Sequence, residues 1–263
     1  MSGALTMAEL IFHSVVRSVR AKHNNAIIAL VQNLLQVIVM VGAFYLMFLL
    51  FGLSRAPIRA DFVLFLLSGV FLFVTHVKSV TAVMGAEGPT SAMMLHAPMN
   101  TIISISASAL SVLYLNLVTI IVILFAYHAI VGGVEMQDPA GAFGMLILAW
   151  FTGCAVGLMF LSIKPWFPGT VGIMTTIYRR AQMIASGKMF VANALPASVL
   201  VAFEWNPLFH IIDQNRGFMF RNYFPHVTSW HYALGVGVVL VVIGLMAEFY
   251  TRRHASASWY ARR

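Results

Sequence analysis

Charged side chains are scarce in this chain of 263 residues: Asp, Glu, Lys and Arg make up 9% of it, whereas apolar residues make up 60%. Soluble domains carry about 25% charged residues, and a soluble fold of this composition would expose large apolar patches. The composition therefore argues against a water-soluble enzyme. Intrinsic disorder is excluded, because there is ample apolar surface to bury. A membrane protein is predicted.

Cysteine and acidic residues are also few. The single cysteine, Cys154, excludes an intrachain disulfide and lies in an apolar run, where it is expected to be a small core residue. The chain has eight acidic residues and sixteen Lys and Arg, which gives a net charge of +8. In a membrane protein such an excess marks cytoplasmic ends and contacts with anionic headgroups. We therefore expect a lipid bilayer, and no nucleic acid, as the partner of these charges.

Motifs that carry catalytic chemistry are missing. The chain has no G-x-x-x-x-G-K-[ST] loop for ATP, no H-E-x-x-H, no C-x-x-C and no G-x-S-x-G. Its nine histidines include no pair spaced three or four residues apart, so a metal site on one helix is not expected. We predict no catalytic residue, no metal and no cofactor for this chain.

Long apolar runs predict an all-α polytopic protein with six membrane-spanning helices, since about 20 residues cross the hydrocarbon. The predicted spans are 26–51, 62–84, 101–131, 140–163, 172–195 and 229–248. In the first span, Gln32, Asn33 and Gln36 lie on one side, where amides usually seek a protein partner. In the fourth, Gly153 and Gly157 form a small-xxx-small pair suited to close helix contact.

Both ends of the chain are basic. Residues 5–22 are amphipathic, with Arg17 on the polar face, which is typical of a helix lying in the headgroup plane; an ordinary packed helix is the alternative. Four arginines lie in the tail at 252–263. The positive-inside rule therefore favours cytoplasmic termini, and we divide the chain into an interface helix (1–25), a transmembrane domain (26–251) and a basic tail (252–263).

The segment 196–228 differs from the spans because prolines and charges interrupt it. Asn206 can cap a short helix whose first residue is Pro207. We expect short re-entrant or interfacial helices here, before the last span.

The fifth predicted span holds the most costly residues. Arg179 and Arg180 would lie about 11 Å deep if the span begins near Gly172, and an arginine at that depth needs a protein partner, water or an anionic ligand. Such residues usually mark a pathway, which Lys188 could extend; an anionic, hydroxyl-rich passenger would suit it. The alternative is that the span begins at Ala181 and that these side chains reach the headgroups.

The order of these parts resembles the permease subunit of type-2 ABC exporters of capsular polysaccharide, O-antigen or similar glycans. The resemblance covers nearly the whole chain. Its most specific part is Trp205-Asn206-Pro207-Leu208-Phe209-His210-Ile211-Ile212, with Arg216 four positions further on. Asp213-Gln214-Asn215 departs from the more usual Glu-containing run before that arginine.

The resemblance implies a homodimeric channel in the bacterial inner membrane for a lipid-linked acidic polysaccharide, with separate ATPase subunits that bind ATP and Mg. Periplasmic and outer-membrane export proteins are further implied partners.

The implied site residues fall into three groups. ATPase coupling involves Arg17 and the loop 85–99, with Glu87, Pro89, Met93, Met94 and His96. The periplasmic gate is 196–228, with Trp205, Asn206, Pro207, His210, Asp213 and Arg216. The translocation pathway has Arg179, Arg180 and Lys188, with Tyr45 and Tyr178 as aromatic side chains that could stack on sugars or simply pack at the membrane interface.

Other functions stay open at this point. The same fold could export a drug, haem or a lipid. A polytopic glycosyl or acyl transferase would need acids or histidines converging at a membrane face, and the spans supply few. A structural scaffold would leave the arginine pair unexplained.

Overall fold

The computed structural model describes residues 13–15, 26–52, 58, 60–86 and 101–254. The regular structure in these ranges is helical. Five helices there are long and apolar enough to cross a membrane: α2 (Ala26–Leu50), α3 (Phe62–Met84), α5 (Thr101–Val131), α6 (Pro139–Ile163) and α10 (Trp230–His254). The prediction of an all-α, multi-pass membrane protein is confirmed.

Helix bounds follow the hydropathy pattern closely. The bounds of α2, α3, α5 and α6 lie within one residue of the predicted spans. Asp61 and Asp138 cap α3 and α6 by accepting hydrogen bonds from backbone amides of the first turn. The last helix, α10, continues to His254, beyond the predicted end at residue 248. The prediction ended at a charge, but Glu248 is only 6% exposed and packs inside the bundle.

The fifth predicted span differs from the observed helix. Instead of 172–195, α7 covers Pro168–Ala185 and is not among the five long apolar helices. The chain turns at Gly187, whose φ of +71° lies in the left-handed region that glycine tolerates. A 3₁₀ turn η1 (Ala192–Ala194), a short helix α8 (Ala197–Phe203) and the buried helix α9 (Pro207–Met219) follow.

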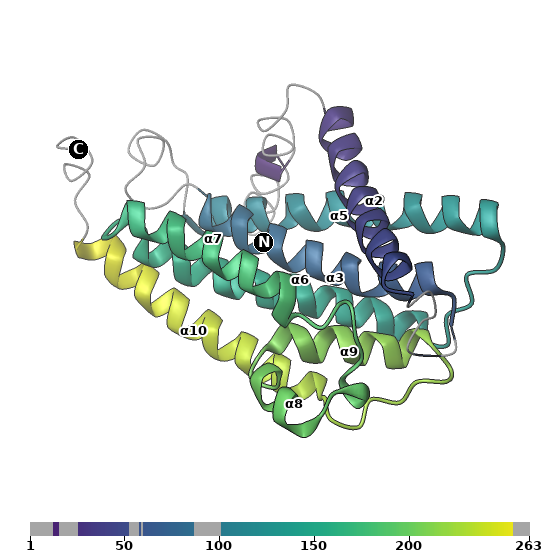
Figure 1. The fold of residues 1–263 in the computed structure, drawn as a ribbon. Coiled ribbons are helices and arrows are strands. Elements are labelled where there is room, and N and C mark those ends of the chain that lie inside the picture. The colour runs from purple at the N-terminus through teal and green to yellow at the C-terminus, as the bar shows by residue number, and fades with distance from the viewer. Residues whose placement is uncertain (1–12, 16–25, 53–57, 59, 87–100, 255–263) are drawn as a thin grey trace.

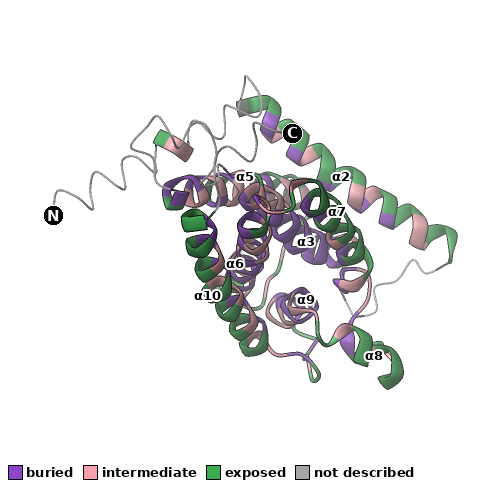
Figure 2. Ribbon diagram, turned by 90° about the vertical axis from the view of Figure 1, so that its left-hand side faces the viewer, coloured by how far each residue is buried: buried purple, intermediate pink, exposed green. Residues whose placement is uncertain are grey.

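Helix α3 lies at the centre of the bundle. Figure 1 shows α5, α6 and α7 running alongside α3 and α10 packed against α6, while α2 crosses the bundle at a steep angle and α8 and α9 lie at one side. In the view along the bundle, α3 is buried and α9 lies beside α6 and α10 with its buried face toward them (Figure 2). The buried side chains of α3 therefore touch most of the other helices.

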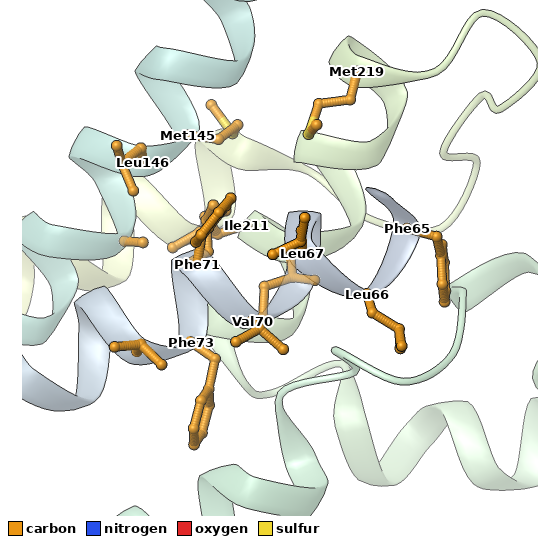
Figure 3. Close-up of a cluster of buried hydrophobic side chains, with 14 of the residues drawn as sticks. Phe65, Leu66, Leu67, Val70, Phe71, Phe73, Met145, Leu146, Ile211 and Met219 are labelled. Carbon is orange, nitrogen blue, oxygen red and sulfur yellow. The ribbon is translucent and has the colours of Figure 1, made fainter. Parts of the chain in front are cut away.

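The apolar core joins α3, α6 and α9. Figure 3 shows Val70 and Phe71 of α3 beside Leu146 of α6 and Ile211 of α9. Because α9 contributes fully buried residues such as Ile211 and Ile212, it is part of the core and not an attached surface helix. The polar residues that α9 carries are thereby held inside the protein.

Candidate functional site

The side chain of Asn206 joins the end of α7 to the start of α9. Its Oδ1 accepts a hydrogen bond from the amide of Leu208 at 3.1 Å, which confirms the predicted cap ahead of Pro207. Its Nδ2 donates to the carbonyl oxygen of Ala185 and to Oε1 of Gln182, each at 2.8 Å. One amide thus satisfies backbone groups at two helix ends.

Arg216 of α9 is fully buried and binds the chain that follows α7. Its guanidinium donates to the carbonyl oxygens of Gly187 at 3.0 Å and Lys188 at 2.6 Å, and also to that of Phe190. The guanidinium carbon lies 4.3 Å from the centroid of the Phe65 ring in α3. The planar fork of arginine suits this set of carbonyls, so Arg216 fixes the loop after Gly187 onto the core.

Asp213, one turn earlier on α9, holds the segments on either side of that helix. Its Oδ1 accepts from the amide of Ala192 at 3.0 Å and from the hydroxyl of Tyr223 at 2.5 Å, and its Oδ2 accepts from Thr228 at 2.8 Å. Burial, with the nearby Asp213 carboxylate, raises the pKa of Tyr223 above its ordinary value, so the phenol stays protonated and donates. The acid predicted for the gate therefore orders the segment 192–228.

The other residues of the predicted gate lie around the start of α9. The Nδ1 of His210 accepts from the amide of Ser229 at 3.0 Å, and its Nε2 donates to the carbonyl oxygen of Glu204 at 2.7 Å. Trp205 is 76% exposed. The structure therefore separates the predicted gate into a buried part, which includes Asp213 and Arg216, and an exposed part at α8 and Trp205.

The two arginines predicted for the pathway lie inside α7, about 17 Å along the helix from Pro168 at 1.5 Å per residue. Arg179 and Arg180 are both exposed, and the exposed surface of α7 is otherwise largely apolar, with Ile173 and Ile177. Figure 2 shows this exposed side of α7 at the rim of the bundle. Two guanidinium groups are therefore presented outward from a helix among membrane spans.

Lys188 lies in a different environment from these arginines. It is 1% exposed, its Nζ is 4.0 Å from the centroid of the Phe73 ring and 5.3 Å from that of Phe44, and it donates to the carbonyl oxygen of Met183. The predicted continuation of a positive lane by Lys188 stays a prediction. In this structure its ammonium group is enclosed by aromatic rings.

The two tyrosines predicted for the pathway have ring neighbours within the protein. Tyr178 is half-buried, and its ring packs edge-on against Phe160 at 6.0 Å between centroids. Tyr45 is 41% exposed, and its ring lies 5.8 Å from that of Phe62. Their stacking on sugars stays a prediction.

Two polar residues of the site were not singled out from the sequence. His76 of α3 and Gln182 of α7 are buried and meet at the hydroxyl of Tyr178, at 2.8 Å and 3.0 Å respectively. The available signal was a histidine and an amide inside apolar segments, where polar groups need partners.

The residues predicted for ATPase coupling, Arg17 and Glu87, Pro89, Met93, Met94 and His96, lie outside the described residues. Among the residues that the structure describes, no group of His, Cys, Asp and Glu could hold a metal ion.

The helical bundle with its five long apolar helices is that of a multi-pass membrane protein. No model of a protein family matches the chain. Two sequences of the Escherichia coli polysialic acid transport protein KpsM are 25% and 24% identical to it over 199 residues, covering 74% of this chain and 75% of each relative. This distant homology confirms the resemblance to glycan-export permeases that the sequence motifs predicted.

Proposed function

We propose that this chain is the channel-forming subunit of an ATP-driven exporter that moves a lipid-linked, acidic polysaccharide across the bacterial inner membrane. The observation that carries the proposal is the outward presentation of Arg179 and Arg180 on α7, in a chain distantly homologous to a polysialic acid transport protein. Guanidinium groups within a membrane domain need an anionic or aqueous surrounding, and an acidic glycan in a channel provides one. The class of cargo follows from this charge.

In this proposal α7 is the fifth of six spans, and α8 and α9 are re-entrant helices of a periplasmic gate. Both termini then lie in the cytoplasm, where the segment 1–25 and the loop 85–99 contact the ATPase. Two copies of the chain enclose the channel, and ATP and Mg bind only to the separate ATPase subunits. Export proteins of the periplasm and outer membrane are further partners.

The first test asks which proteins copurify with this chain from native membranes. A tagged copy of the full chain, purified from native membranes, should retain a stoichiometric ATPase with a Walker motif. The complex should hydrolyse ATP, whereas the chain alone should not. Failure to recover such an ATPase from the native membranes would reject an ATP-driven exporter.

The second test concerns the charge of the cargo. We expect Arg179→Ala combined with Arg180→Ala to reduce export of an acidic glycan, and Arg252→Ala, at the exposed end of α10, to leave it unchanged. A neutral drug, haem or lipid cargo would instead be carried equally well by the double variant. Export is measured as polymer delivered, on addition of ATP, into the lumen of inverted vesicles or of proteoliposomes whose ATPase faces outward.

A further inference from the structure

A chain of hydrogen bonds, which we call the α3–α7–α9 chain, links His76, Tyr178, Gln182 and Asn206. The Nδ1 of His76 lies 3.2 Å from the carbonyl oxygen of Ala149 in α6, and its Nε2 lies 2.8 Å from the Tyr178 hydroxyl. A carbonyl oxygen only accepts, so Nδ1 donates to it and Nε2 accepts from Tyr178.

The hydrogen bonds of the α3–α7–α9 chain continue to α9 through the side-chain amides of Gln182 and Asn206. The Nε2 of Gln182 donates to the Tyr178 hydroxyl at 3.0 Å and to Oδ1 of Asn206 at 3.2 Å, and Nδ2 of Asn206 donates back to Oε1 of Gln182 at 2.8 Å. Every donor in this series thus meets an acceptor. Breaking one bond leaves a buried polar group unsatisfied, which costs more than the bond itself contributes in water.

These bonds matter because α7 rests on the rest of the protein through a narrow stripe. Its buried residues are Val171, Thr175 and Gln182, whereas its other faces are largely exposed. Apolar packing along a stripe of this width would by itself tolerate rotation of the helix, because dispersion contacts are individually weak and hydrophobic burial is non-directional. Hydrogen bonds require aligned donors and acceptors, so they select one rotation of α7.

We propose that His76, Tyr178 and Gln182 are positioning residues that set the rotation of α7 about its axis and thereby aim Arg179 and Arg180 away from the core. The functional part of this inference rests on the proposed function, in which these arginines line the pathway. Adjacent residues on a helix differ by about 100°, so a shift of one position would turn the arginines toward a neighbouring helix or toward lipid.

The test uses two conservative variants that remove the hydrogen-bonding groups and keep the size of each side chain. Tyr178→Phe retains the ring against Phe160, and Gln182→Met retains the side-chain length. Tyr114→Phe, on the exposed surface of α5, is the matched control. All are made in a Cys154→Ala background so that single cysteines can be labelled.

Rotation is measured with nitroxide labels at two neighbouring threonines of α7, attached through Thr175→Cys and Thr176→Cys. Thr175 is 3% exposed and Thr176 is exposed, so collision with both oxygen and a nickel chelate should be low at 175, and collision with at least one of them should be high at 176. We expect the variant carrying both Tyr178→Phe and Gln182→Met to lose this contrast, and Tyr114→Phe to keep it. An unchanged contrast in the double variant, with the dimer intact by size-exclusion chromatography, would overturn the inference.

The two reagents also separate this inference from the proposed function. Oxygen partitions into lipid, whereas the nickel chelate stays in water. High collision with the chelate at 176 therefore supports an aqueous pathway beside α7. Collision with oxygen alone would reject that pathway but leave the rotation result unchanged. If both hold, acidic glycan export should fall about fivefold in Tyr178→Phe, the factor that the loss of one hydrogen bond represents. Unchanged export alongside lost contrast would show that rotation is set by these residues but does not limit transport.

Discussion

Gly153 of α6 faces the backbone of His76 in α3 so closely that a Cβ placed on the glycine would lie 2.5 Å from the carbonyl oxygen of His76. One helical turn further on, a Cβ at Gly157 would lie 2.8 Å from the carbonyl oxygen of Val80. The two central helices therefore meet backbone to backbone along this face. The small-xxx-small pair that the sequence suggested is confirmed as a contact between α6 and α3.

Substitution of Gly153 by alanine should destabilise the transmembrane domain by about 1–3 kcal/mol, because backbone atoms cannot yield as a flexible side chain can. Gly157→Ala should act in the same direction. Gly144→Ala is the matched control on the same helix, since nothing lies within 4 Å of its added Cβ. Thermal unfolding of the three purified variants in one detergent checks the order; equal midpoints for Gly144→Ala and Gly153→Ala would contradict the close contact.

Asn33 should contribute more to the packing of α2 than its neighbouring amides. Its Nδ2 donates to Oδ1 of Asn116 at 3.1 Å and to Oγ1 of Thr119 at 2.7 Å in α5, whereas Gln32 and Gln36 are exposed. We expect Asn33→Leu to cost about 0.6–1.7 kcal/mol, the range of such bonds within membranes. Gln36→Leu, the control, should leave the unfolding midpoint unchanged, and a loss as large as that of Asn33→Leu would count against the assignment.

Much of the fold could be predicted because lipid imposes a simple rule: a helix that crosses the membrane must be long and apolar. This rule placed the bounds of α2, α3, α5 and α6 within one residue. Local chemistry likewise predicted the Asn206 cap with Pro207 behind it, since both depend only on neighbouring residues.

Features that depend on contacts between residues far apart in the sequence could not be predicted from hydropathy or from neighbouring residues. The apolar pattern continues past Gly187, so the sequence predicted a helix to residue 195, whereas the chain leaves α7 at Ala185 because Arg216 binds the carbonyl oxygens of 187, 188 and 190. The motif indicated Arg216 as a gate residue but not its burial. Of the amides on one side of α2, the pattern could not tell which would meet α5.

Loss of Arg216 should be among the most damaging single changes in the described part of the chain. Arg216→Met would leave three carbonyl oxygens without a donor, and unsatisfied buried groups cost about 1–3 kcal/mol each. Arg216→Lys keeps the charge but not the planar fork, so it should rescue only in part. Arg221→Met, which alters an exposed arginine just after α9, is the control. Limited proteolysis should cut the segment 186–196 faster in Arg216→Met than in the original protein, and no faster in Arg221→Met. Equal rates in the two methionine variants would rule out the role of Arg216 in fixing this segment.

The hydrogen bond between Tyr223 and Asp213 should make stability fall at alkaline pH. Because the pKa of Tyr223 is raised in the folded protein, ionisation near its ordinary value of 10.0 occurs only in the unfolded chain. The contribution of this phenol is therefore complete below pH 10.0 and is lost as the pH rises beyond it. Tyr223→Phe should cost about 1 kcal/mol at neutral pH and show a smaller loss of stability above pH 10. Parallel alkaline unfolding curves for the two proteins would be inconsistent with this pairing.

Lys188 allows stability and transport to be separated at one position. Its ammonium group is buried between the rings of Phe73 and Phe44, and moving a charge out of water costs free energy that these contacts offset only in part. Lys188→Met fills a similar volume without the charge, so we expect unfolding stability to stay equal or to rise.

Export of the acidic glycan by Lys188→Met is then compared with the stability of that variant. If the Lys188 charge serves only to anchor the loop, transport of an acidic glycan should survive in Lys188→Met as stability does. If Lys188 belongs to the predicted pathway, export should fall in a protein that is no less stable, because an apolar side chain cannot stabilise a passing anion. Phe73→Leu is the companion variant, since it removes the ring 4.0 Å from the ammonium while keeping the charge. Reduced export in Lys188→Met together with retained export in Phe73→Leu would assign the effect to the charge and not to the packing around it.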